Sequence, residues 1–245
     1  MNSVIRQRYG KAALAVFLSL PGYALAASVP ATVKLAQEQT ITINNGTEVA
    51  SLDPHKTEGV PESDVIGNLL EGLLSTDNMG RLVPGVAQQW QQQNNVWTFT
   101  LRPDARWSNG DPVTAADFVY SWQRLVDPKT ASPYASFLQY AHILNVDEIV
   151  AGKQPPSALG VKALDDHHLQ VTLSQPVSYF TAMLENTALK PVHRQTIEQW
   201  GDKWTRPEHY VGNGAFTLSN WVVNEKITLR RNPHYWDNAH TVIET

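Results

Sequence analysis

The sequence of 245 residues contains no cysteine. This absence excludes a disulfide framework, a zinc–thiolate site, a thiol nucleophile and an anchor through a lipid-modified cysteine. Long apolar runs are missing as well, because no segment reaches the roughly 20 residues that a membrane-spanning helix requires. We therefore expect neither thiol chemistry nor a transmembrane segment in this protein.

Basic residues do not outnumber the acidic ones: 19 lysines and arginines stand against 23 aspartates and glutamates. Three of the basic residues, Arg6, Arg8 and Lys11, lie near the N-terminus, so the rest of the chain carries 16 against 23, a net charge of −7. An acidic chain without a basic cluster binds nucleic acid and anionic membranes poorly. We exclude both as partners.

The first 26 residues have the pattern of an export signal. The basic residues near the start are followed by an apolar run, Ala12–Leu20, and by small residues at Ala24 and Ala26. This order predicts a signal peptide over residues 1–26, with cleavage after Ala26. The alternative, a helix that stays in the membrane, is disfavoured because the apolar run is too short. We expect the mature protein in a bacterial periplasm.

Motifs for phosphate binding and nucleophilic catalysis are also missing. Gly212-Asn213-Gly214 lacks the third glycine and the strand–helix context of a dinucleotide loop, and no G-x-S-x-G sequence occurs. His167 and His168 could ligate a metal, but neighbouring residues on a strand point to opposite faces. We interpret them, with the adjacent Asp165-Asp166, as a solvated turn, and we predict no metal and no cofactor.

Aromatic residues, by contrast, are plentiful, with eight tryptophans and eight tyrosines. Tryptophans can stack on sugars and carboxylate pairs cleave glycosides, so an exported carbohydrate-active enzyme is an alternative. Trp107, Trp122 and Trp204, however, each fall where an inward apolar residue is expected. We expect these three in the core, and we predict that the protein is not an enzyme.

Alternation of apolar and polar residues predicts several strands. Thr40–Asn44 alternates around two isoleucines, and Val96–Arg102 places Trp97, Phe99 and Leu101 on one face, which we expect to point inward. The same reasoning predicts a strand that contains Leu169, Val171 and Leu173, and a hairpin of Ala215–Trp221 and Lys226–Arg231.

Helical signals lie between these strands. Thr114 is a good N-cap, with Asp117 three residues on as a capping-box partner, and Asp127-Pro128 ends the helix. Pro84–Trp90 is interpreted as a half-buried helical turn that leads into a strand. Because short strands and helices alternate without a regular βαβ period, we predict a mixed α/β (α+β) fold rather than a dinucleotide-binding sheet.

One segment, Ser51–Ser63 with the sequence SLDPHKTEGVPES, belongs to neither kind of element. It is too polar for a core and too rich in turn-forming residues for a helix. An apolar pattern of helical spacing comes next, and we expect that helix to start at Pro61, with Ser63 or Asp64 near its cap. By themselves these residues favour an ordinary connecting loop, although such a loop can also present free backbone groups to a ligand.

Six stretches of the sequence carry a family resemblance. They are SLDPHKTEGVPES (51–63), LLEGLL (69–74), VPGVAQQW (83–90), WTFTLRPDARWSNGDPVTAADFVYSWQRLVDPKTASPYASFLQYAH (97–142), LGVKALDDHHLQVTL (159–173) and GNGAFTLSNWVVNEKITLRRNPHYWDNA (212–239). Together they resemble the periplasmic oligopeptide-binding proteins, the family 5 extracellular solute-binding components of ABC peptide importers. The resemblance runs from about Val29 to the end of the sequence.

The resemblance implies a fold of two lobes around a cleft, of which this chain matches the N-terminal part, a lobe like that of type II periplasmic binding proteins. It implies that residues 27–70 and 194–245 form an incomplete ligand-contacting domain, and that 71–193 form a smaller outer domain of the same lobe. Family members are longer, and a strand pattern breaks off after Thr241–Ile243. We therefore expect a truncated chain without the second lobe, which binds peptide weakly or not at all and is a monomer at full length.

The resemblance also assigns ligand-binding residues. Glu58, Gly59 and Val60 are expected on the wall of the cleft, where the peptide adds as a strand to an exposed backbone. Gly59 allows close approach, and Glu58 can attract a basic side chain. Tyr134 matches a tyrosine that faces the peptide in the family.

The function that the resemblance implies is delivery of oligopeptides from the periplasm to the membrane permease of an ABC importer. Murein peptides, dipeptides or another solute are alternatives within the family. Residues of the sequence do not decide between them.

Overall fold

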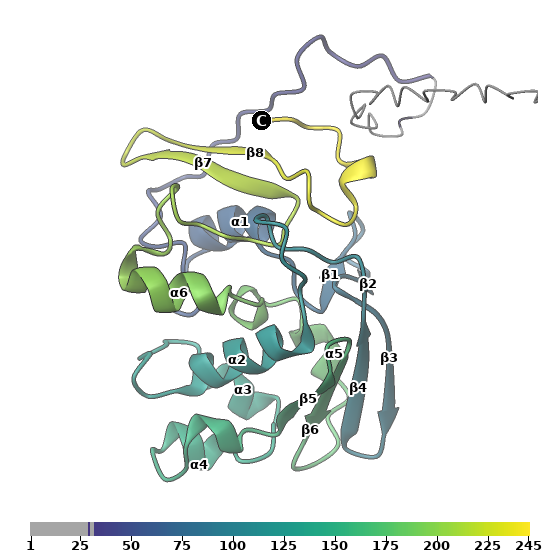
Figure 1. Cartoon of the computed structure of the whole chain (residues 1–245), viewed down its shortest axis with the longest axis vertical. Coiled ribbons are helices and arrows are strands. Elements are labelled where there is room, and N and C mark those ends of the chain that lie inside the picture. Colours follow the sequence, from purple (N-terminus) through teal and green to yellow (C-terminus); the bar gives the residue numbers. More distant parts are fainter. Residues whose placement is uncertain (1–28, 30–31) are drawn as a thin grey trace, which may run out of the picture.

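The computed structural model describes residue 29 and residues 32–245, so the predicted signal peptide lies outside the described residues. The described part has the predicted mixed α/β fold, with helices on one side of a four-stranded antiparallel sheet and a separate hairpin packed on another helix (Figure 1). Within this part, no helix combines the length and the apolar character that crossing a bilayer requires.

The helices and strands occur in this order: α1 (Val60–Leu69), β1 (Leu74–Thr76), β2 (Leu82–Pro84), β3 (Ala87–Gln93), β4 (Val96–Leu101), α2 (Ala115–Val126), α3 (Phe137–Tyr140), α4 (Val146–Val150), β5 (Val161–Asp165), β6 (His168–Thr172), α5 (Phe180–Met183), α6 (Arg194–Trp200), β7 (Phe216–Val222) and β8 (Lys226–Arg231). Short 3-10 turns occupy Pro156–Ala158, Thr187–Leu189, Gly201–Lys203 and Asn238–His240.

The main sheet has the strand order β3-β4-β6-β5, with every neighbouring pair antiparallel. In β4 the predicted inward residues Trp97, Phe99 and Leu101 are all buried, which confirms the register that the alternation predicted. A strand with one apolar face must cover that face, and here α2 packs against β5 and β6.

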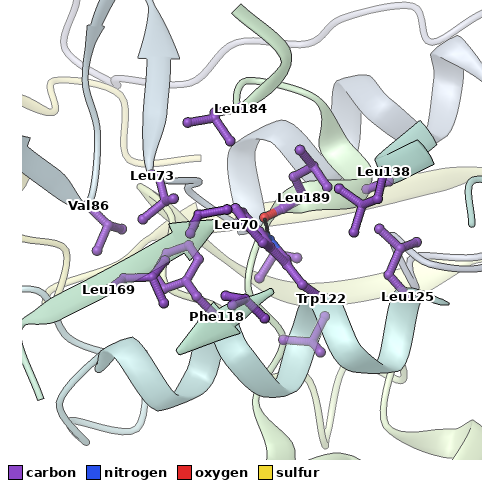
Figure 2. Packing of buried hydrophobic residues seen from close by; sticks show 14 of the residues in the cluster. Leu70, Leu73, Val86, Phe118, Trp122, Leu125, Leu138, Leu169, Leu184 and Leu189 are labelled. Atoms are coloured by element: carbon purple, nitrogen blue, oxygen red, sulfur yellow. Dashed lines mark hydrogen bonds between the residues drawn. The ribbon is translucent and has the colours of Figure 1, made fainter. Parts of the chain in front are cut away.

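Helix α2 carries the centre of the core. Its start is fixed by the predicted capping box, in which the Asp117 carboxylate accepts a hydrogen bond of 2.7 Å from the backbone N–H of Thr114. Figure 2 shows Phe118, Trp122 and Leu125 of this helix packed among buried leucines from other elements. The Trp122 indole also donates to the carbonyl oxygen of Leu189 at 2.9 Å, so a buried polar atom is satisfied. The predicted burial of Trp107, Trp122 and Trp204 is confirmed.

The C-terminal hairpin β7–β8 packs beside α1. The chain reaches it through Gly212-Asn213-Gly214, predicted as a turn, which passes close to the end of α1: the N–H of Gly214 donates to the carbonyl oxygen of Leu69 at 2.9 Å. A Cβ atom on Gly214 would lie 2.6 Å from the carbonyl oxygen of Asn68. Glycine is therefore required there by the close approach of two backbones.

Two of the predictions of secondary structure are wrong. Thr40–Asn44 is not a strand in the structure, and its Ile41 and Ile43 are exposed. Backbone hydrogen bonds join residues 39 and 41 to residues 244 and 245, with the N–H of Ile41 donating to Thr245 at 3.0 Å, but among the described residues this pairing does not continue along 42–44. Pro84–Trp90 is not helical, since Ala87 begins β3, which pairs with β4.

Candidate functional site

The predicted ligand segment begins as an irregular loop whose polar side chains are turned inward. Asp53 and His55 are 3% and 0% exposed, and the Asp53 carboxylate accepts a hydrogen bond from the backbone N–H of His55 at 3.0 Å. Buried charges need partners. The partner here is Arg124, in the last turn of α2, whose two terminal nitrogens lie 3.0 Å and 2.6 Å from the two oxygens of Asp53.

This ion pair determines the charge of Asp53. Burial would by itself raise the pKa of the carboxyl, but the hydrogen bonds and charge of Arg124 outweigh it, so the pKa lies below its usual value. Asp53 is therefore a carboxylate at neutral pH, held in a bidentate pair. Such geometry fixes orientation as well as position.

His55 is held neutral by the same surroundings. Burial and the neighbouring Arg124 lower its pKa to about 3. Its Nδ1 lies 2.6 Å from an Arg124 nitrogen, and because a guanidinium only donates, Nδ1 must accept and the ring proton sits on Nε2. In the described part of the chain Nε2 has no hydrogen-bond partner.

The segment 194–245 holds the other side of the loop. The Trp204 indole nitrogen lies 3.4 Å from an oxygen of Asp53, and the Tyr210 hydroxyl donates to the carbonyl oxygen of Leu52 at 3.3 Å. Further along, the Lys56 ammonium pairs with Asp202 at 3.0 Å. The loop is thus fixed between α2 and the residues that come after α6.

Glu58, Gly59 and Val60 come directly after this fixed part and face outward. Glu58 is exposed, Gly59 is half-buried, and Val60 is 73% exposed. None of the hydrogen bonds among the described residues uses the backbone N–H groups of these three. The structure thus brings together three of the four predicted site residues, with free backbone donors on a rigid support.

The helix after this edge starts earlier than predicted. Val60, not Pro61, is the first residue of α1, and the N-cap is Gly59 rather than Ser63 or Asp64. Glu62, in the first turn of α1, connects this start to the preceding chain: its carboxylate accepts a hydrogen bond from the backbone N–H of Ala50 at 2.7 Å. The start of α1 is thereby tied to the beginning of the loop.

This tie makes Gly59 sensitive to substitution. A Cβ atom at Gly59 would lie 1.9 Å from Oε2 of Glu62, so Gly59→Ala must shift this carboxylate, whose other oxygen accepts the hydrogen bond from Ala50. We expect a loss of about 1–3 kcal/mol in the free energy of unfolding, the usual cost of losing a charge-assisted hydrogen bond. Urea denaturation measures it.

Gly67→Ala is the matched control for this variant, since it lies on the exposed side of the same helix with nothing near its Cβ position. Gly67→Ala should raise the free energy of unfolding by about 0.5–1 kcal/mol, because alanine forms helices better than glycine does. Equal stabilities of the two variants would show that Glu62 does not hold the loop.

Tyr134, the fourth predicted residue, lies on a different loop, which comes after α2. Its ring is half-buried and packs edge-on against Phe137, with ring centroids 5.9 Å apart. Because Arg124 is in the last turn of α2, this loop leaves from the helix end that holds the 53–55 segment, as Figure 1 also indicates. The structure thus places Tyr134 on a separate loop from the other three predicted residues.

A second buried charge lies at the junction of α1 and β1. The two carboxylate oxygens of Glu71 accept hydrogen bonds of 2.6 Å from the Tyr235 hydroxyl and from the Trp236 indole. Burial raises the pKa of Glu71. The Arg102 guanidinium lies over the Trp236 ring, 3.5 Å from its centroid. Because both oxygens are occupied by the protein, Glu71 holds the chain after β8 in place rather than facing a substrate.

Sequence reasoning missed the residues that support the site, namely Asp53, His55 and Arg124. In the sequence, Asp53 and His55 are recognisable only as polar residues on either side of a proline. Nothing in the sequence indicates that Arg124, 71 positions after Asp53, is their partner. For metals, the described residues contain no group of three or more histidine or acidic side chains that could hold an ion. Asp165 and His168 form an exposed pair at 2.8 Å.

Comparison with known proteins places this geometry in context. Residues 81–244 match the middle region of the bacterial extracellular solute-binding proteins, family 5. The chain is similar to the periplasmic oligopeptide-binding protein OppA of Salmonella typhimurium, at 57% identity over 99% of this chain and 45% of that protein. It is also similar to the periplasmic murein peptide-binding protein MppA of Escherichia coli, at 48% identity over 94% of this chain and 43% of that protein.

Among solved structures, the fold is similar to Haemophilus influenzae OppA in complex with the peptide RPPGFSPFR. The TM-score is 0.84 at 51% identity, covering 86% of this chain and 42% of that one. The chain therefore spans less than half the length of the relatives that it matches.

Proposed function

We propose a function from the premise that this chain belongs to the bacterial extracellular solute-binding proteins, family 5. In this proposal the protein binds oligopeptides in the periplasm and passes them to the membrane permease of an ABC importer. Two relatives are named for oligopeptide and murein-peptide binding, and a related structure holds a peptide of nine residues. These likenesses support a peptide as the ligand.

The observation that carries the proposal is the set of backbone N–H groups at Glu58–Val60 that bond to no other described residue and lie on a buried support. A carrier of varied peptides must recognise what all peptides share, which is the backbone. The unpaired N–H groups at 58–60 can donate hydrogen bonds to the carbonyl groups of an extended peptide, which is thereby added as a strand. The buried Asp53–Arg124 pair keeps this edge in one conformation, which lowers the entropy cost of binding.

Side chains around this edge would then select among peptides. Glu58 is exposed and anionic, so it favours a basic ligand side chain. Tyr134 offers ring area and a hydroxyl group. Val60, which is 73% exposed, presents an apolar surface. Water can fill the remaining space next to ligand side chains of different size.

The domain division proposed from the resemblance is compatible with the sheets. All four strands of the main sheet fall within residues 71–193, whereas α1 and the β7–β8 hairpin fall within 27–70 and 194–245. We propose that the latter part contacts the ligand. Export through the signal peptide at 1–26 would place both parts in the periplasm.

Thermal unfolding in the presence of tetrapeptides tests the function. We expect Tm to rise continuously with peptide concentration, because a ligand that binds only the folded state stabilises it. The rise should need high peptide concentrations, since weak binding is expected of a chain that spans less than half the length of its relatives. The matched control is the same peptide with alternate backbone nitrogens methylated, which cannot form the strand ladder and should leave Tm unchanged. No rise, or an equal rise with the methylated peptide, would contradict the proposal.

The same thermal-unfolding assay distinguishes an oligopeptide from the other candidate ligands. A murein tripeptide and a bile acid serve as further ligands, since one relative is named a probable deoxycholate-binding protein. Membership of a solute-binding family speaks against the carbohydrate-active enzyme considered from the aromatic content. Hydrolysis of oligosaccharides by the purified chain would reopen that alternative.

A further inference from the structure

An exposed aromatic pair lies at the end of α6. Trp200, the last residue of this helix, is 40% exposed, and its ring stacks face to face on His209, with centroids 3.7 Å apart and planes 10° apart. The imidazole covers one face of the indole. The exposed fraction of Trp200 leaves indole surface open to solvent.

The pair is attached to the core on the side of His209. The next residue, Tyr210, is buried and stacks on Trp204 with centroids 5.3 Å apart. The Tyr210 hydroxyl donates to the carbonyl oxygen of Leu52, and Trp204 approaches Asp53. The indole surface is therefore presented by a rigid base, and a ligand that stacks on it does not have to order a mobile side chain.

An ion pair connects the segment after Trp200 to the segment before the proposed peptide edge. Asp202, two residues after Trp200, pairs at 3.0 Å with Lys56, which stands two residues before Glu58. In Figure 1 the C-terminal end of α6, the C-terminal end of α2 and the N-terminal end of α1 lie on the same side of the molecule. A peptide held at Glu58–Val60 could thus extend toward Trp200.

From this arrangement we infer that Trp200 and His209 form a stacking platform for a planar side chain of the peptide ligand, an aromatic ring or a guanidinium group. The indole face attracts both kinds of group. The Asp202 side chain, 94% exposed, adds a carboxylate for the guanidinium. The inference rests on the proposed peptide binding, and it assigns to that site a preference for planar side chains.

The platform can be tested without a peptide. N-acetyl-arginine amide and N-acetyl-phenylalanine amide are titrated into the 15N-labelled chain, and the indole N–H signal of Trp200 is identified by its loss in Trp200→Phe. We expect this signal to move progressively with both probes. The amides of norleucine and cyclohexylalanine, which are apolar but not planar, should move it far less. No movement, or equal movement with the aliphatic probes, would overturn the platform.

The second test is calorimetry with peptides of the form Ala-X-Ala-Ala. X is arginine, phenylalanine, norleucine or cyclohexylalanine, and further peptide sets carry X at the other positions. Trp200→Ala should weaken binding of the arginine and phenylalanine peptides about five- to tenfold at one position and leave the norleucine peptide within twofold. Asp202→Asn should weaken the arginine peptide alone. Tyr140→Ala, which removes another exposed aromatic ring, is the matched control and should change none of them.

The two tests distinguish failure of the platform from failure of the proposed function. If no peptide binds although the amides move the Trp200 signal, the proposed function fails and the platform stands. If peptides bind with affinities that Trp200→Ala does not change, and the amides do not move the signal, the function stands and the platform is overturned.

Discussion

Arg124→Ala is expected to lower the free energy of unfolding by about 3–5 kcal/mol. The side chains of Arg124 and Asp53 are 13% and 4% exposed, and both oxygens of Asp53 are bonded to the guanidinium. Alanine would leave a buried carboxylate without its charged partner, and would also remove the donor to His55. Urea denaturation of the purified variant measures the loss.

Arg194→Ala is the matched control, because Arg194 also forms an ion pair, at 2.7 Å with Glu198, but on the surface. Surface ion pairs contribute little to stability, so Arg194→Ala should change the free energy of unfolding by less than about 1 kcal/mol. Arg124→Lys should fall between the two, since lysine keeps the charge but not the bidentate geometry. Similar losses in Arg124→Ala and Arg194→Ala would show that the Asp53–Arg124 pair does not support the loop.

Replacing both partners offers a further check. Asp53→Leu combined with Arg124→Met removes the buried charges together, and it should be more stable than Arg124→Ala alone, because no unpaired charge remains. Peptide binding need not recover with stability. A variant that is stable but binds weakly would indicate that the ion pair positions the Glu58–Val60 edge in addition to stabilising the fold.

Acid should destabilise the protein through His55. Its pKa is about 3 in the folded state and near 6.5 in the unfolded chain. Between these values the unfolded chain binds a proton that the folded chain does not, so falling pH favours unfolding. This one group is expected to remove about 2 kcal/mol from the free energy of unfolding between pH 6.5 and 4.5, with a limiting slope of about 1.4 kcal/mol per pH unit.

The difference between the wild type and His55→Asn isolates this contribution. Asparagine offers an oxygen to Arg124 in place of Nδ1 but does not titrate, so its stability should fall less steeply over the same pH range. Burial also lowers the pKa of His193, and raises that of Glu71, but both act equally in the two proteins and cancel. Asp53, with its lowered pKa, adds a loss only when the pH falls below about 4.

His234→Asn, at an exposed histidine, is the control for the substitution itself and should behave as the wild type does. Urea denaturation at intervals of half a pH unit gives all three curves. Parallel curves for the wild type and His55→Asn would mean that His55 is not buried in its neutral form.

Much of the fold is predictable from short-range patterns in the sequence. The alternation in Val96–Leu101 predicted which residues face the core, and Thr114 with Asp117 predicted the start of α2. These predictions succeed because side-chain direction in a strand and capping of a helix depend on neighbouring residues. The family resemblance, carried by six longer stretches, indicated the fold class and the residues of the proposed edge.

Strand formation itself was predicted less well. Thr40–Asn44 has a clear alternation, but among the described residues only its Ile41 donates a backbone hydrogen bond to another segment, and its isoleucines stay exposed. The glutamine-rich Ala87–Gln93, in contrast, is a strand because β4 pairs with it along its length. A strand exists only through its hydrogen bonds to another segment. The sequence of the segment alone does not contain that information.

The sequence by itself thus determined the predicted export signal, the absence of thiol chemistry, the central core residues and the family. Only the tertiary structure decided what supports the proposed site: Asp53 meets Arg124 across 71 positions and Trp204 across 151. The physical reason is that a buried charge is tolerated only when a partner reaches it. That partner is supplied by the packing of distant segments, which no local pattern records.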